Sequence, residues 1–169
     1  SAFVEIQPIK NLFFKSTLGA DYATYQGKKI LPTFTEGAFN RTTNSLTLDE
    51  NKYLSYTFSN TLRYNWDLDQ RHNFKFLAGT EYINTNLDFD NTRKEGYAIQ
   101  TEEYFTLSAG TGNTTVAGGS TGNSLFSLFG RIDYNFSDKY LASVTLRQDG
   151  SSRFGEDNRY GFFPAASVG

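Results

Sequence analysis

Few residues in this sequence could do chemistry. His72 is the single histidine, and the chain has no cysteine. It lies beside a turn, close to Asp67, Asp69 and Arg71. A zinc site or an activated nucleophile needs several convergent partners. Zinc binding and Cys–His catalysis are therefore excluded, and we interpret His72 as a solvated turn residue.

Two groups of acidic residues offer oxygen ligands. One is the segment 88–91 (DFDN), and the other comprises Asp149, Glu156 and Asp157. Neither follows the spacing of a calcium-binding EF-hand loop, so we interpret both as solvated loop charge. No set of nucleophile, base and orienting group is visible. We expect no metal, no cofactor and no enzymatic activity.

The remaining charges lie in segments that alternate between apolar and polar residues. Lys52–Leu68 shows this most clearly, because its even positions are nearly all apolar and its odd positions polar. His72–Asn86 continues the pattern with Phe74 and Phe76. A period of two is typical of β-strands with one apolar and one polar face.

Two further strands form a predicted hairpin around the turn Ser137-Asp138-Lys139. Apolar residues occupy even positions both before the turn, in Ser124–Phe136, and after it, in Tyr140–Leu146. A shift of one residue would move every side chain to the opposite face. A three-residue loop keeps the faces matched, and it predicts that Tyr134 pairs with Ala142 and Ile132 with Val144.

The rest of the chain supplies three more strands and three long loops. We expect strands over Ala2–Ile6 and Leu12–Tyr22, joined by a turn at Pro8–Lys10, and a last strand from Tyr160. The expected loops cover 23–50, 87–123 and 150–159, and the Gly/Ser/Thr-rich run 108–123 predicts a flexible segment. The fold class is therefore all-β, with seven antiparallel strands.

Composition favours a transmembrane β-barrel. Hydrophobic residues make up only 38% of the chain, and the mean hydropathy is -0.50, yet 17% of the residues are aromatic. No apolar run is long enough for a membrane helix. In a barrel only alternate residues face lipid, and aromatic residues gather at the interfaces. The net charge of -2 argues against a nucleic-acid partner.

Short turns alternate with long loops, as in outer-membrane barrels with short periplasmic turns and long extracellular loops. Seven strands cannot close a barrel alone, so we expect a segment of a larger one. The expected lipid-facing residues are Phe58, Leu62, Tyr64, Trp66, Phe74, Phe76, Ile132, Tyr134 and Val144.

The charged residues of the polar face are lumen-facing candidates: Arg63, Glu81, Arg131, Asp133, Arg147 and Asp149. They either tune selectivity or pair with each other or with a plug domain, and pairing is favoured for any one of them. The aromatic residues of the loops are candidates for contact with a sugar or a partner, with internal packing as the equal alternative: Tyr97, Tyr104, Phe105 and Phe154.

The segment Leu146–Gly169 (LRQDGSSRFGEDNRYGFFPAASVG) resembles the signature of SusC/RagA-type TonB-dependent transporters of the Bacteroidota. The stretches DGSSRFG, NRYG and FPA match in order, and a weaker likeness covers the whole chain. The plug domain and TonB box of that family match nothing here. The resemblance therefore implies that residues 1–169 are part of one barrel domain of about 22 strands.

The same resemblance implies an integral outer-membrane protein that imports oligosaccharides or peptides. Its implied partners are a SusD-like surface lipoprotein that closes the extracellular mouth, TonB acting through the absent N-terminal part, membrane lipid and lipopolysaccharide. Two alternatives remain open. One is a passive porin or structural barrel, and the other is a soluble all-β carbohydrate-binding module whose aromatic face packs on a second sheet.

Overall fold

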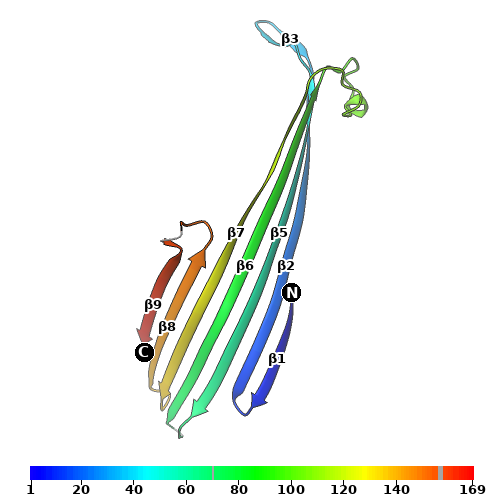
Figure 1. Ribbon diagram of the computed structural model, residues 1–169. Helices are drawn as coiled ribbons and strands as arrows, with labels where there is room; N and C mark the ends of the chain where they lie inside the picture. Colours follow the sequence, from blue (N-terminus) through cyan, green and yellow to red (C-terminus); the bar gives the residue numbers. More distant parts are fainter. Residues whose placement is uncertain (70, 156–157) are drawn as a thin grey trace. The chain divides into compact units, whose positions relative to one another are not determined.

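The computed structural model describes residues 1–69, 71–155 and 158–169. Gln70, in the turn predicted at 69–71, and Glu156 and Asp157, in one acidic group, lie outside the described residues. Seven strands form one sheet in the order β1-β2-β5-β6-β7-β8-β9 (Figure 1). Their bounds are β1 Ala2–Ile9, β2 Leu12–Leu31, β5 Ser45–Asp67, β6 His72–Glu95, β7 Thr114–Phe136, β8 Tyr140–Ser151 and β9 Tyr160–Val168. The prediction of an all-β fold with seven antiparallel strands is confirmed for this sheet.

A separate two-stranded sheet pairs β3 (Phe34–Glu36) with β4 (Phe39–Arg41). Glu102–Tyr104 form one turn of 3-10 helix, η1. Within the described part of the chain, no helix is long and apolar enough to cross a membrane.

The predicted hairpin register is confirmed. Tyr134 pairs with Ala142 and Ile132 with Val144, and the ladder closes at Phe136 and Tyr140. Ser137 and Asp138 take the left-handed conformation, with φ of 52° and 54°. A tight turn whose residues have positive φ matches the twist of the flanking strands.

Paired residues keep the same parity in these ladders, except for Ile9 and Leu12, so the sheet has two distinct sides. Ile6 pairs with Phe14 and Leu146 with Pro164, whereas Glu5 pairs with Lys15. We call the side that carries even-numbered strand residues the even face and the other side the odd face. The even face is largely apolar and the odd face largely polar, as the alternation predicts.

The strands that enter the long loops extend further than predicted. β2 continues to Leu31 and β5 begins at Ser45, inside the expected loop 23–50. β6 continues to Glu95 and β7 begins at Thr114, inside the expected loop 87–123. Polar residues occur on both sides of these extensions, so the hydrophobic contrast is weak there. Backbone pairing along a ladder does not require that contrast.

Two glycines of the run 108–123, where we expected a flexible segment, have a packing role within a strand. Residues 114–123 belong to β7, and Gly118 and Gly119 leave space for side chains of β6. A Cβ atom on Gly119 would lie 3.0 Å from a ring carbon of Phe89. A glycine inside a strand often marks such a close approach.

The first turn also differs from the prediction. It comprises Lys10 and Asn11 rather than 8–10, and Asn11 has a φ of 66°. Pro8 lies within β1, where the register shifts between Ile6 and Ile9. Proline lacks an N–H group, so it is tolerated at such an irregularity.

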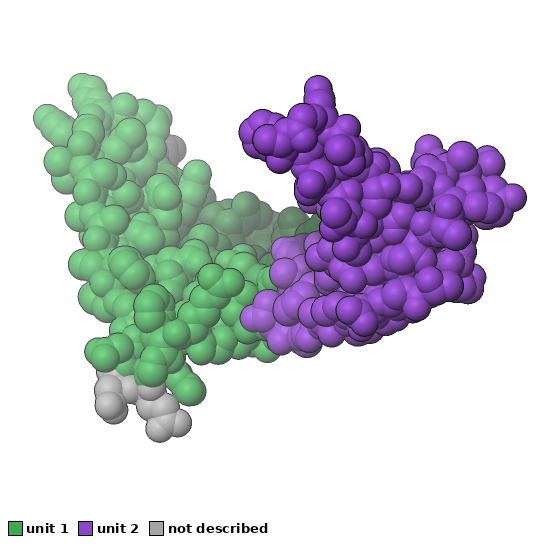
Figure 2. Space-filling view, turned by 90° about the horizontal axis from the view of Figure 1, so that it is seen from above, with its two compact units in different colours: residues 1–21, 55–85, 122–169 green, residues 22–54, 86–121 purple. Residues whose placement is uncertain are grey.

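The chain divides into two compact units (Figure 2). Unit 1 holds residues 1–21, 55–85 and 122–169, and unit 2 holds 22–54 and 86–121. The buried apolar residues among those described are Leu46, Tyr97 and Phe105, all in unit 2. The described part of unit 1 therefore exposes the apolar side of its sheet. Exposed apolar surface of this extent marks a site of interaction with a membrane or a partner.

Candidate functional site

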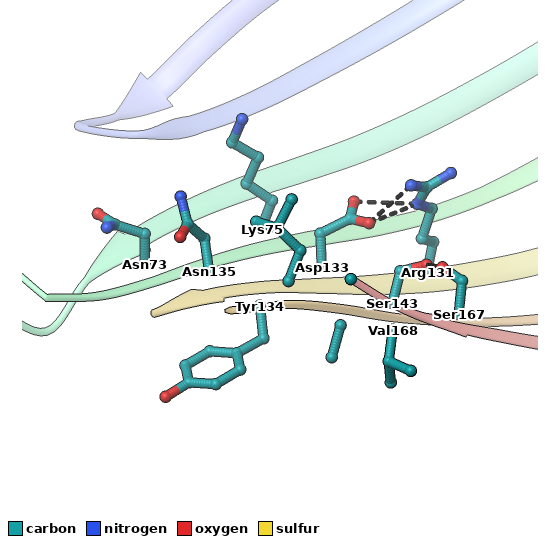
Figure 3. A pocket seen from close by; sticks show the side chains of 12 residues that line it. Asn73, Lys75, Arg131, Asp133, Tyr134, Asn135, Ser143, Ser167 and Val168 are labelled. Carbon is teal, nitrogen blue, oxygen red and sulfur yellow. Dashed lines mark hydrogen bonds and ion pairs between the residues drawn. The ribbon is translucent and has the colours of Figure 1, made fainter. Parts of the chain in front are cut away.

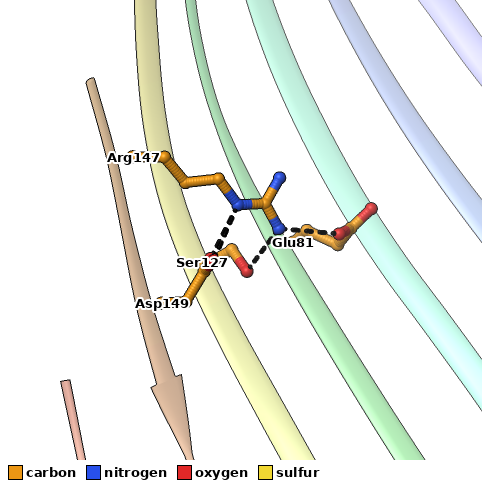
Figure 4. Close-up of polar contacts among 4 residues, drawn as sticks. All are labelled: Glu81, Ser127, Arg147 and Asp149. Atoms are coloured by element: carbon orange, nitrogen blue, oxygen red, sulfur yellow. Dashed lines mark hydrogen bonds and ion pairs between the residues drawn. The ribbon is translucent and has the colours of Figure 1, made fainter. Parts of the chain in front are cut away.

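Arg147, on the odd face of unit 1, joins three strands through its guanidinium group (Figure 4). Its Nε donates to both carboxylate oxygens of Asp149, at 2.7 and 3.0 Å. One terminal nitrogen donates to the hydroxyl of Ser127 at 3.0 Å and lies 3.6 Å from a carboxylate oxygen of Glu81. Ser127 is fully buried beneath it. These four residues, which we call the Arg147 network, link β6, β7 and β8.

Arg131 and Asp133 form a second ion pair on the odd face, with a closest N–O distance of 2.7 Å. They line a groove of about 520 Å³ that also contains Lys75 of β6 and the Ser143–Ser167 hydroxyl pair (Figure 3). Lys75 forms no ion pair with any residue the structure describes. The groove therefore carries one more positive than negative side chain.

Arg63, the remaining charged candidate, lies over the ring of Phe13, with its guanidinium carbon 4.6 Å from the ring centroid. The structure thus joins Glu81, Arg147 and Asp149, and separately Arg131 and Asp133. Pairing with each other is among the favoured alternatives for these charges, and five of the six lie in such ion pairs.

Sequence reasoning missed several aromatic residues on the odd face, among them Phe13, Phe129 and Phe163. Phe13 lies beneath Arg63, and Phe129 lies 5.8 Å from the Arg147 guanidinium. Phe163 pairs with Arg147 across the ladder and is 56% exposed. Their signal was present in the sequence as phenylalanines at odd positions. A cation over an aromatic face is attracted by the negative potential of the ring.

The even face carries a band of stacked aromatic rings beside the short turns. Trp66 stacks on Phe74 at 5.5 Å between centroids, Phe74 on Tyr134 at 4.8 Å, and Tyr64 on Phe76 at 6.5 Å. The other lipid-facing candidates of this face are aliphatic or phenyl side chains that are about half exposed: Phe58, Leu62, Ile132 and Val144.

His72 is not a solvated turn residue. It begins β6 and is half-buried, and its Nδ1 lies 2.7 Å from the hydroxyl oxygen of Tyr134. Its ring also stacks on Tyr134 and contacts Phe136. Sequence distance concealed this contact, because β6 and β7 are neighbours only in the folded sheet. The described residues contain no group of three acidic, histidine or cysteine side chains placed to hold a metal ion.

Asp69 organises the turn before β6. Its carboxylate accepts backbone N–H groups of Arg71 at 2.7 Å and of His72 at 2.8 Å. These two hydrogen bonds stabilise the ionised form and hold the pKa of Asp69 below its usual value.

The loop aromatics fall into two classes. Tyr97 and Phe105 are buried in unit 2 with Leu46, and their rings lie 4.5 Å apart. Internal packing, one of the two alternatives, is therefore the arrangement of Tyr97 and Phe105. Burial raises the pKa of the Tyr97 phenol. Tyr104 and Phe154 are exposed, at 49% and 59%.

Comparison with known proteins decides the family. No protein-family model matches the chain. It is 30% identical over 175 residues to the "TonB-dependent receptor P39" of Formosa agariphila, covering 99% of this chain and 16% of that protein. It is 50% identical over 50 residues to the "TonB-dependent receptor SusC" of Bacteroides thetaiotaomicron, covering 30% of this chain and 5% of that protein.

A solved structure agrees. The structure of the RagAB peptide transporter matches with a TM-score of 0.86 and 25% identity, covering 98% of this chain and 18% of that one. The chain is a barrel segment of the SusC/RagA family. It spans about a sixth of the length of the full-length relatives it matches.

The SusC/RagA signature DGSSRFG is structural in this segment. Asp149 binds Arg147, Ser152 exchanges two hydrogen bonds with Ser124, and Arg153 donates to Asn123 at 3.0 Å. The signature thus ties the loop after β8 back to β7.

The glycine of the signature has a packing role. Gly150 lies beneath the ring of Tyr160, its partner in the β8–β9 ladder. A Cβ atom at Gly150 would lie 2.6 Å from that ring. Any other residue there would displace Tyr160, which belongs to the second part of the same signature.

Proposed function

We propose that this chain is part of the barrel domain of a TonB-dependent outer-membrane importer of oligosaccharides or peptides. One observation carries the proposal: a seven-stranded sheet with opposite apolar and polar faces follows the fold of the RagAB peptide transporter over 98% of its length. The relatives are named as receptors, and none is named as an enzyme.

In this proposal the even face meets lipid and the odd face lines the lumen. The exposed even-face residues of unit 1 support the first assignment, because an open sheet in water would expose a large apolar patch. The aromatic band beside the short turns then lies at the headgroups of one leaflet, where amphipathic rings are favoured. The short turns are periplasmic, and the long loops that follow β2, β6 and β8 are extracellular.

The proposal includes two protein partners. A SusD-like lipoprotein would close over the extracellular side, as the resemblance to the SusC/RagA family implies. TonB would supply energy through a part of the protein outside this segment. Of the four aromatic loop candidates, Tyr104 and Phe154 are exposed and could contact a sugar, a peptide or the lipoprotein.

The alternatives have less support. A soluble carbohydrate-binding module requires a second sheet on the aromatic face, and the described residues place none there. A passive porin would share the faces of the sheet, but the relatives are named TonB-dependent receptors.

Uptake by cells that carry the full-length protein tests the function. Labelled oligosaccharide and peptide mixtures would be supplied to wild-type cells, to a strain without the gene and to wild-type cells treated with a protonophore. Active import predicts that gene loss and the protonophore each abolish uptake of the same compounds. Uptake that depends on the gene but continues with the protonophore would identify a passive porin.

A further inference from the structure

A groove of about 320 Å³ crosses the even face of unit 1. Its floor consists of the small residues Ala78 and Gly130. Leu62 and Tyr64 stand on one side of it, and Val144 and Leu146 on the other. Apart from Arg131, the side chains that line it are aliphatic or aromatic.

Packing within the chain does not account for Gly130. Gly79 and Gly161 lie beneath phenylalanine rings, and a Cβ atom on either would approach a ring carbon within 2.9 Å. A Cβ atom on Gly130 would meet nothing closer than the carbonyl oxygen of Leu77, at 3.7 Å. Glycine weakens a strand relative to residues with side chains. The space above Gly130 is therefore maintained at a cost and filled by no residue the structure describes.

We propose that this groove binds one acyl chain of a glycerophospholipid, an inference that rests on the proposed membrane setting. The groove begins at the aromatic band, because Tyr64 and Phe76 line it. Tyr134 lies four residues from Gly130 along β7, a distance of about 14 Å at roughly 3.4 Å per residue. Its hydroxyl meets His72 there, so a polar end and an apolar channel follow one another along the strand.

A polar end followed by an apolar groove favours a lipid over a protein as the bound molecule. The phenol groups of Tyr64 and Tyr134 lie toward the short turns, at the level where a headgroup would sit. In the proposed orientation that end faces the periplasmic leaflet, so the occupant is a glycerophospholipid rather than lipopolysaccharide. A hollow the width of one missing side chain suits a single acyl chain, whereas a stable protein interface needs about 800 Å² from each partner.

Lipid retention by the full-length protein tests the proposal. The protein would be extracted in a mild detergent, exchanged into lipid-free micelles and analysed for retained phospholipid by native mass spectrometry. Gly130→Phe fills the groove. Ala20→Phe is the matched control, because Ala20 is an exposed even-face residue on β2 and does not line the groove.

We expect wild type and Ala20→Phe to retain one phospholipid, and Gly130→Phe to bind it at least about tenfold more weakly, which corresponds to about 1.4 kcal/mol. Thermal unfolding of each variant checks that the barrel is intact. Equal retention by all three proteins would overturn the proposal. Retained lipopolysaccharide, or a wild-type dimer that Gly130→Phe converts to monomer, would also overturn it. Failure of outer-membrane fractionation would instead reject the proposed function.

Discussion

Arginine substitutions at adjacent positions of β8 test which side of the sheet meets lipid. Val144 lies on the even face, and Ser143 lies on the odd face opposite Asp133. Val144 is 48% exposed, so an arginine has room there. The cost of Val144→Arg should therefore come from placing a charge in hydrocarbon rather than from crowding.

The depth of Val144 sets the magnitude. It lies four residues after Tyr140, where β8 begins. At roughly 3.4 Å per residue and a tilt of about 40°, this is about 10 Å from the short turn. The apolar band of an outer-membrane barrel is about 25 Å tall, and a charge deep within it costs about 2–4 kcal/mol. This corresponds to about 30- to 700-fold in the folding equilibrium.

Ser143→Arg is the matched control. It should cost less than about 1 kcal/mol, because the new guanidinium stays on the polar side opposite Asp133 and the Ser143–Ser167 hydroxyl contact that it replaces is exposed. Thr145 is a poorer control, since its partner is Arg131 and like charges opposite each other are destabilising. Urea titration of the full-length protein folded into phospholipid vesicles measures both costs. Equal costs, or a larger cost for Ser143→Arg, would refute the lipid-facing assignment.

Three further predictions concern other contacts. Arg147→Met leaves two carboxylates without their cation and should destabilise the protein by about 1–3 kcal/mol in the same titration; an unchanged midpoint would show that water replaces the contact. Asn44→Ala removes two buried hydrogen bonds to the Tyr97 backbone, so we expect faster proteolysis at 96–113, and unchanged cleavage would contradict this. Asp69→Ala should lower the stability of the protein above pH 3.8, the ordinary pKa of an aspartate. The stability difference from wild type should vanish as the pH falls through the lowered pKa of Asp69 in the folded protein, and a difference that grows in acid would contradict the assigned hydrogen bonds.

The strand count, phase and hairpin register could be predicted because each depends on parity. Trp66 and Phe74 lie on one face because the turn between them preserves the alternation. Ile132 pairs with Val144 for the same reason. A side-chain period of two makes every alternative register expose the wrong face. Sequence alone therefore determined the faces of unit 1.

The strand extensions and the core of unit 2 could not be predicted in this way. Residues such as 114–123 have no strong hydrophobic contrast, so only the folded ladder reveals them as strand. Leu46, Tyr97 and Phe105 come from segments far apart in sequence and share no periodicity. Their contact depends on Asn44, whose buried side chain binds the backbone of Tyr97 at 2.7 and 2.8 Å.

Five of the six charged candidates on the odd face form ion pairs. Arg147 lies between Glu81 and Asp149, and Arg131 pairs with Asp133. These pairs join residues of different strands or residues two apart on one strand, so they hold side chains in place while adding little long-range field. In the proposed lumen this surface would offer shape and hydrogen bonds to a solute rather than strong attraction of one charge.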